Sequence, residues 1–275
     1  MATPILEKHR LAGTLGDLLV DVRAPGDASP RPAVVVLHGF KGFKDWGMFP
    51  PFSERLARAG FTAVSYNSSG SGVDDEGRFA WPERFGRFTF SGEIADLTSV
   101  VSALAGGALG PTPTTIGVLG HSRGGGVSIL TTPELPVVRA LATWSAIGTV
   151  DRWPGTTRRI WRERGYLDVT NQRTGEVLPV YPDVLDDIEA HQARYDIVAT
   201  AARLTVPWLL VHAEDDETIP IAEGKALAAA APRAQSLMLE RGGHTYGATH
   251  PLSGRPAAME RVFDATITHF SRSLE

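Results

Sequence analysis

A serine between two glycines is the residue of this chain best placed to act as a nucleophile. Ser122 lies in Gly120-His121-Ser122-Arg123-Gly124, directly after the apolar run 115–119 and before the helix-like run 125–130. A buried strand that turns sharply into a helix, with a serine at the bend, exposes the serine hydroxyl at the top of a sheet. The two glycines let the backbone turn without Cβ clashes. The pattern therefore predicts nucleophilic chemistry at Ser122.

A serine hydroxyl needs a base, and the base needs an orienting acid. Two downstream segments offer them, each just after an expected strand: the carboxylate run Glu214-Asp215-Asp216-Glu217 and the turn Gly242-Gly243-His244. His244 is the histidine in a glycine-rich turn at a strand end, and His250 is the alternative base. The chain order serine, acid, histidine is one that parallel α/β enzymes use.

Stabilising an oxyanion requires two backbone N–H groups aimed at one point. The N–H of Arg123, first in the helix after Ser122, is one candidate. The other is the N–H of Phe40, in the loop that follows the β-branched run 33–37, where Gly39 and Gly42 permit tight backbone geometry. We therefore expect Phe40 and Arg123 to form an oxyanion hole.

The elements that must position these residues alternate between strands and helices. Such alternation predicts an α/β fold with a mostly parallel, doubly wound sheet that has helices on both faces. The expected strands are 18–23, 31–37, 61–66, 115–119, 140–145, 207–212 and 236–239, and the expected helices are 52–59, 94–104, 125–130, 222–231 and 258–274.

Residues 151–202 interrupt this alternation, with no clear strand and many Trp, Arg and Pro residues. We interpret them as a small cap over the carboxyl edge of the sheet, inserted into a single core domain made of residues 1–150 and 203–275. The alternative is a surface excursion that only stabilises the fold. Trp46, Trp153 and Trp161 are expected to wall an apolar pocket, although such aromatics are equally often packing residues.

The charged residues of this insertion have two interpretations. The arginines at its start either pair with the carboxylates of its later part across the cap surface, which is the interpretation we favour, or one or two of them line the pocket and favour a carboxylate-bearing substrate. The arginines are Arg152, Arg158, Arg159, Arg162 and Arg164, and the later carboxylates are Asp183, Asp186, Asp187 and Glu189. Of the other histidines, we expect His38 and His212 to be structural, His121 to pack sideways, and His250 and His269 to lie at the surface.

Composition narrows the function classes. The chain has 275 residues, 43% hydrophobic and 21% charged, which is ordinary for a globular protein. The net charge of −4 gives no reason to expect nucleic acid as a partner, and the absence of cysteine excludes thiol catalysis. No signal peptide or membrane-spanning stretch is visible, so we expect a cytoplasmic enzyme. The oligomeric state stays open.

Four motifs together resemble the α/β-hydrolase superfamily, near its dienelactone-hydrolase and small serine-esterase branch. They are His38-Gly39-Phe40, Gly120-His121-Ser122-Arg123-Gly124-Gly125, Asp216-Glu217-Thr218-Ile219-Pro220 and Gly243-His244. The resemblance covers nearly the whole chain from residue 34 onward. It implies a catalytic triad of Ser122, Asp216 and His244, with the N–H groups of Phe40 and Arg123 as the oxyanion hole. In that family the acid lies three residues before an aliphatic-proline pair, here Ile219-Pro220, which selects Asp216 ahead of Asp215 and Glu214.

The resemblance also implies an activity. It points to hydrolysis of small-molecule carboxylic esters through a covalent acyl-enzyme, with no metal or organic cofactor. Two alternatives remain: a peptidase or amidase of the prolyl-oligopeptidase type, and a non-catalytic binding protein on the same fold. A cofactor-free oxidase or perhydrolase would use the same three residues.

Overall fold

An eight-stranded sheet lies at the centre of the computed structural model, which describes residues 3–171 and 175–274. In spatial order its strands are β1 (Ile5–Ala12), β2 (Asp17–Ala24), β4 (Thr62–Asn67), β3 (Ala33–Leu37), β5 (Ile116–His121), β6 (Val138–Trp144), β9 (Trp208–Ala213) and β10 (Gln235–Leu239). From β4 to β10 all neighbours are parallel, while β2 is antiparallel to both β1 and β4. The carboxyl ends of six strands therefore meet at one edge.

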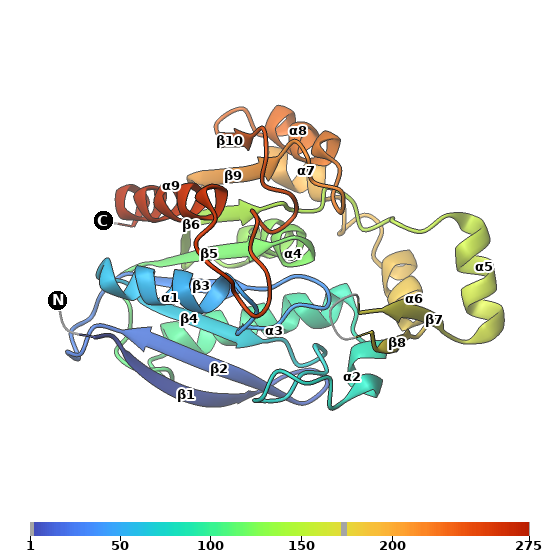
Figure 1. The fold of residues 1–275 in the computed structure, drawn as a ribbon, viewed down its shortest axis with the longest axis horizontal. Helices are drawn as coiled ribbons and strands as arrows, with labels where there is room; N and C mark the ends of the chain where they lie inside the picture. The colour runs from blue at the N-terminus through green and yellow to red at the C-terminus, as the bar shows by residue number, and fades with distance from the viewer. Residues whose placement is uncertain (1–2, 172–174, 275) are drawn as a thin grey trace.

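Helices cover both faces of this sheet (Figure 1). Because side chains alternate along a strand, β3 sends Val34 and Val36 to one face and Val35 and Leu37 to the other. The first face packs against α1 (Phe49–Arg58) and α9 (Ala257–Ser273). The second packs against α3 (Phe90–Ala105), α4 (Arg123–Thr131) and α8 (Ile221–Ala230). This is the expected α/β-hydrolase fold, a mostly parallel sheet between two helical layers.

The segment between β6 and β9 contains its own elements, namely α5 (Gly155–Arg164), β7 (Leu167–Thr170), β8 (Val177–Val180), α6 (Asp183–Ala190) and α7 (Ile197–Ala202). The expectation that this segment has no strand is wrong, because β7 and β8 pair as an antiparallel hairpin. Figure 1 shows α5 and this hairpin beyond the carboxyl ends of the parallel strands. In contrast, α7 packs on α4 and α8 within the helical layer. Residues 172–174 of the expected insertion lie outside the described residues.

Two short helices complete the elements, α2 (Pro82–Gly86) before α3 and the 3-10 helix η1 (Thr132–Glu134) after α4. The α2 helix packs against β8, so the hairpin rests on the core. None of the helices in the described part of the chain combines the length and apolar character that crossing a membrane requires.

Candidate active site

Ser122 sits at a strained turn between β5 and α4. Its φ of 57° and ψ of −121° place it in the left-handed half of backbone space, which non-glycine residues rarely occupy. The turn is held by hydrogen bonds: the Ser122 N–H donates to the Trp144 carbonyl at 2.8 Å, and the Ser122 carbonyl accepts from the Gly125 N–H at 3.0 Å. The geometry is that of a strand-to-helix elbow with the serine at its apex.

The glycines on either side of Ser122 are required by close backbone approach. A Cβ atom on Gly120 would lie 2.3 Å from the Gly124 carbonyl oxygen, and one on Gly124 would lie 2.2 Å from the His38 carbonyl oxygen. Both distances are far below a tolerable contact, so the elbow and the loop after β3 can approach only without these side chains.

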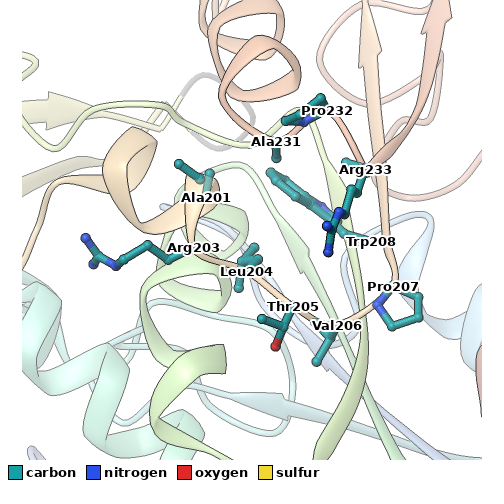
Figure 2. A pocket seen from close by; sticks show the side chains of 12 residues that line it. Ala201, Arg203, Leu204, Thr205, Val206, Pro207, Trp208, Ala231, Pro232 and Arg233 are labelled. Carbon is teal, nitrogen blue, oxygen red and sulfur yellow. The ribbon is translucent and has the colours of Figure 1, made fainter.

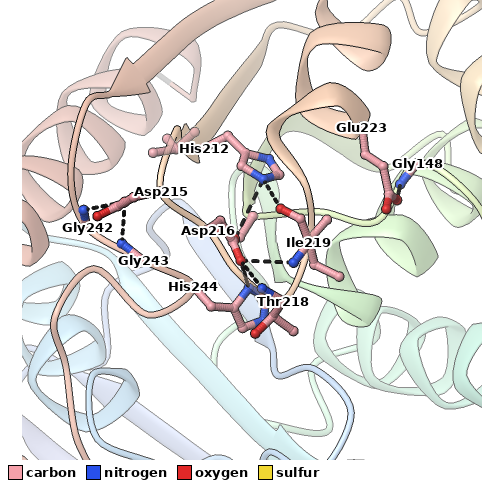
Figure 3. A network of polar contacts seen from close by, with 12 residues as sticks. Gly148, His212, Asp215, Asp216, Thr218, Ile219, Glu223, Gly242, Gly243 and His244 are labelled. Atoms are coloured by element: carbon pink, nitrogen blue, oxygen red, sulfur yellow. Dashed lines mark hydrogen bonds and ion pairs between the residues drawn. The ribbon is translucent and has the colours of Figure 1, made fainter.

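His244 and Asp216 meet across two loops at the ends of β9 and β10 (Figure 3). The Nδ1 of His244 lies 2.9 Å from Oδ2 and 3.2 Å from Oδ1 of Asp216. Oδ1 also accepts hydrogen bonds from the N–H groups of Thr218 and Ile219, each at 2.9 Å. Because an ionised carboxylate only accepts, Nδ1 carries the proton, and Nε2 of His244 is left as a base.

The environment of Asp216 favours its ionised form. Burial acts to raise its pKa, but the hydrogen bond and charge of His244 and the N–H donors of Ile219 and Thr218 outweigh burial and lower the pKa to about 2. Asp216 is therefore a carboxylate at neutral pH, able to stabilise a protonated His244.

The neighbouring Asp215 faces another way. Its Oδ1 accepts hydrogen bonds from the N–H groups of Gly242 and Gly243, each at 2.8 Å, and so ties the loop that carries His244 to the loop after β9 (Figure 3). Glu214 is exposed and its N–H donates to the Leu239 carbonyl. The structure thus brings Asp216, and neither of these alternatives, to the imidazole.

The loop after β3 lies against Ser122. A Cβ atom on Gly39 would lie 2.7 Å from Cβ and 3.3 Å from Oγ of Ser122, so the backbone that leads to Phe40 passes directly beside the serine. The next residue, Lys41, has a φ of 61°, and the Gly42 N–H donates to the Gly39 carbonyl at 2.9 Å. The loop therefore brings Phe40 close to Ser122, which Arg123 directly follows in the chain.

Two histidines support the loops that carry His244 and Asp216. Nε2 of His121 lies 3.0 Å from the His244 carbonyl oxygen, and burial lowers the pKa of His121 to about 3, so a neutral imidazole donates to that carbonyl. His212, fully buried in β9, places Nε2 2.9 Å from the Ile219 carbonyl oxygen and 3.6 Å from Oδ2 of Asp216 (Figure 3). Both side chains fix backbone at the site.

His38 is held between Gly39 and Ser68. Its Nε2 accepts from the Ser68 N–H at 3.2 Å, and its Nδ1 donates to the Gly39 carbonyl at 2.9 Å. Burial lowers its pKa from 6.5 to about 4. His38 therefore stays neutral at physiological pH and braces the loop beside Ser122.

The depressed pKa of His38 makes an acid-stability prediction. Between pH 6.5 and 4 the unfolded chain takes up a proton at His38 that the folded protein does not, so stability falls as the pH falls through this window. His38→Asn, which keeps a donor for the Gly39 carbonyl, should reduce this dependence by about 1.4 kcal/mol per pH unit. Urea unfolding of both proteins from pH 7 to 4.5 measures it, and parallel curves would contradict it.

Two cavities meet at Ser122. The larger, about 490 Å³, is lined by residues that include Phe90, Trp153 and Val169, and the smaller, about 210 Å³, by residues that include Trp46, Phe49 and Asn171. Both are also lined by four shared residues, Phe40, Lys41, Ser122 and His244. Ser122 and His244 therefore face the same space from the ends of β5 and β10.

The three tryptophans expected around the pocket take different places. Trp46 lines the smaller cavity and Trp153 the larger one. Trp161 is completely buried, packs edge-on against Trp153 with ring centroids 5.1 Å apart, and donates from Nε1 to the Val180 carbonyl. Trp161 therefore supports Trp153 and is not among the residues that line either cavity.

A third cavity, of about 600 Å³ and drawn in Figure 2, shares no lining residue with the two cavities at Ser122. It is lined by residues 201–208 and 231–234, at the amino end of β9. Since Ser122 and His244 lie at the carboxyl ends of their strands, this cavity opens at the opposite edge of the sheet.

Other sequence expectations meet different outcomes. His269 is buried and its Nε2 lies 2.9 Å from the Leu141 carbonyl oxygen, so its expected surface position is wrong. His250 is half-buried and stacked on Trp46, and its Nδ1 already accepts a hydrogen bond from the Gly47 N–H at 3.0 Å.

The favoured interpretation, in which the basic start of the insertion pairs with its acidic later part, holds for Arg162 and is wrong for the other four arginines. Arg152 also lines the larger cavity, as the alternative interpretation expects. Arg162 bridges to the later part of the insertion, and the others pair locally or with the core. The pairs are Arg152–Glu223, Arg158–Asp151, Arg159–Glu163, Arg162–Asp186, Arg162–Glu189 and Arg164–Asp168.

Sequence reasoning missed two residues at the site. Glu93, in α3, is buried beneath the elbow and forms an ion pair with Arg123. Lys41 follows the expected oxyanion residue Phe40 and lines both cavities. An acidic residue within an apolar helix was the available signal for Glu93, whereas a lysine after Phe40 in a polar loop gives none.

Comparisons with known proteins bear on this arrangement. The chain is 23% identical over 176 residues to 2,6-dihydropseudooxynicotine hydrolase from Paenarthrobacter nicotinovorans, a match that covers 62% of this chain and 44% of that protein. The chain spans less than half the length of the curated relatives it matches.

Solved structures agree in fold over nearly the whole chain. A protein described as a "putative hydrolase" from Agrobacterium vitis S4 superposes with a TM-score of 0.75 at 18% identity, covering 98% of this chain and 100% of that one. Est1E from Butyrivibrio proteoclasticus superposes with a TM-score of 0.68 at 16% identity, covering 97% and 98%.

The model of the alpha/beta hydrolase family matches residues 34–262, from β3 into α9. That range contains the loop after β3, the elbow at Ser122 and the loops that carry Asp216 and His244. The chain belongs to the alpha/beta hydrolase family.

Proposed function

We propose that this protein is a serine hydrolase that cleaves carboxylic esters of small molecules through a covalent acyl-enzyme. One observation carries the proposal: Ser122, at the apex of a strained elbow, and His244, bonded through Nδ1 to the buried carboxylate of Asp216, line the same two cavities. A nucleophile, a base and an orienting acid are the three roles that such catalysis needs.

In the proposed first step, Nε2 of His244 takes the Ser122 proton as Oγ attacks the ester carbonyl carbon. The N–H groups of Phe40 and Arg123 hold the oxyanion, and Asp216 stabilises the imidazolium. When the carbon–oxygen bond to the leaving group breaks, His244 gives that proton to the departing alcohol. Water, activated by His244, then hydrolyses the acyl-enzyme, releases a carboxylic acid and restores Ser122.

Residues 151–202 fit the proposed role of a cap. Trp153, Val169 and Asn171 come from this segment and line the cavities at Ser122. The ammonium group of Lys41 donates to the Thr170 carbonyl of β7 at 3.3 Å, which joins the cap to the loop beside the serine. We infer that this segment, rather than the sheet, shapes the entrance for substrate.

Covalent labelling tests the nucleophile. Wild-type protein incubated with a fluorophosphonate should gain the mass of one adduct, while Ser122→Ala, with the same circular dichroism spectrum, should gain none. Intact-protein mass spectrometry reads both, and a folded wild-type protein that stays unlabelled would rule out the proposal. Matched ester and amide substrates then separate an esterase from an amidase or peptidase.

A further inference from the structure

The charged side chains around the two cavities at Ser122 are all cationic. Lys41 lines both cavities, and Arg123 and Arg152 line the larger one. Among the described residues that line either cavity there is no aspartate or glutamate. Asp216 is close by, but its side chain is fully buried beneath His244.

Two of these cations already form ion pairs with carboxylates of the protein. Arg123 pairs with Glu93, and Arg152 lies 2.9 Å from the Glu223 carboxylate. Within the ranges 3–171 and 175–274, Lys41 forms no such pair: its ammonium group donates to a neutral acceptor, the Thr170 carbonyl. Of the three cations described at the site, Lys41 is therefore the one whose charge has no counter-ion among the described residues of the protein.

Lys41 places this charge beside the two cavities. Its backbone follows Phe40 directly in the loop that would hold the oxyanion, and its ammonium group reaches the Thr170 carbonyl of β7. Partial burial removes water from around the ammonium group and so lowers the pKa of Lys41. A ligand carboxylate would supply the missing partner, and such charge-assisted hydrogen bonds are strong when partly desolvated.

We propose that the site selects esters whose substrate carries a carboxylate, held by the ammonium group of Lys41. The proposal rests on the proposed esterase function and names its substrate class. The carboxylate could belong to the acyl part, as in a dicarboxylic acid half-ester, or to the alcohol part. Lys41 lines both cavities, so the experiment must separate these two sources.

Two matched substrate pairs test the proposal with the wild-type protein. For the acyl side, monomethyl adipate is compared with its neutral primary amide, and for the alcohol side, 4-butyryloxybenzoate is compared with 4-butyryloxybenzamide. We expect kcat/KM for the charged member of one pair to exceed that of its neutral partner about tenfold or more, the size expected of a charged hydrogen bond. The pair that shows the preference locates the carboxylate.

Variants assign the preference to Lys41. In Lys41→Met the ratio of kcat/KM between charged and neutral partners should fall toward one, and Lys41→Arg should retain it. Lys41→Gln, which keeps a donor for the Thr170 carbonyl without the charge, should behave like Lys41→Met, which separates charge from attachment of the cap. Lys225→Met, in α8, is the matched control and should keep the wild-type ratio.

The outcomes are distinct. Equal kcat/KM values for both partners of both pairs, or a preference that survives Lys41→Met, would overturn the role of Lys41. The esterase proposal would still stand in that case if the neutral esters are cleaved and the fluorophosphonate labels the protein. If no ester is cleaved and no adduct forms, the esterase proposal itself fails.

Discussion

Asp216→Asn is expected to lower kcat for ester hydrolysis about 10⁴-fold at neutral pH, with little change in KM. The asparagine side chain would have the volume of the aspartate, but its NH₂ group could replace a carboxylate oxygen facing Nδ1 of His244. A donor there favours the His244 tautomer with its proton on Nε2, where the base must instead accept the Ser122 proton. Steady-state kinetics with an activated phenyl ester measures the effect.

Asp215→Asn is the matched control, one residue away and identical in chemistry. Its amide oxygen can still accept from the N–H groups of Gly242 and Gly243, so the loop of His244 keeps both hydrogen bonds. We expect kcat to stay within about tenfold of wild type, because only the charge assistance of two exposed hydrogen bonds is lost. A loss in Asp215→Asn as large as that in Asp216→Asn would contradict the assignment.

The contrast between these neighbours shows what a sequence can and cannot predict. Four consecutive carboxylates after a strand indicate that an acid is available there, and their spacing from Ile219-Pro220 favours Asp216 only through family resemblance. Which carboxylate faces the imidazole depends on the turn after β9, where the N–H groups of Thr218 and Ile219 converge on Oδ1 of Asp216. That convergence is tertiary geometry, invisible to composition or periodicity.

The central strands were predictable for a physical reason. Strands buried on both faces are continuous apolar runs, so β3, β5 and β9 appear in the sequence within two residues of their observed bounds. The elbow at Ser122 was predictable from its context, because the glycine-flanked serine stands between an apolar strand-like run and a helix-like run. Family comparison confirms the fold that these patterns predict.

The missed strands are short or lie at the edge of the sheet. Strand β1 lies at the edge of the sheet with most of its side chains exposed, and its mixed sequence Ile-Leu-Glu-Lys-His-Arg-Leu-Ala carries no clear apolar alternation. Strands β7 and β8 have four residues each, and the buried side chains of β8, Leu178 and Val180, pack in a cluster formed with other parts of the chain. Segments this short are stabilised by their neighbours, which local sequence does not encode.

Beneath the elbow, Arg123 and Glu93 form a buried ion pair whose disruption should have the largest effect on stability. Their side chains are 8% and 2% exposed, and the Arg123 guanidinium also lies 4.1 Å from the ring centroid of Phe90. Burial raises the pKa of Glu93, an effect that the charge and hydrogen bond of Arg123 oppose. The arginine therefore favours the ionised form of a carboxylate that burial would otherwise penalise.

Arg123→Met is accordingly expected to lower the free energy of unfolding by about 3–5 kcal/mol at pH 8, because it leaves Glu93 without a cation. The loss should shrink as the pH falls: without Arg123 the pKa of Glu93 in the folded protein rises further above its unfolded value, and uptake of a proton then favours the folded state. Urea unfolding of wild type and variant at pH 8 and 5.5 measures both effects.

The double variant Arg123→Met/Glu93→Leu removes the unpaired carboxylate and should recover most of the stability at pH 8. A double variant as unstable as Arg123→Met would instead assign the loss to packing of Arg123 against Phe90 and Phe88, and not to the buried charge.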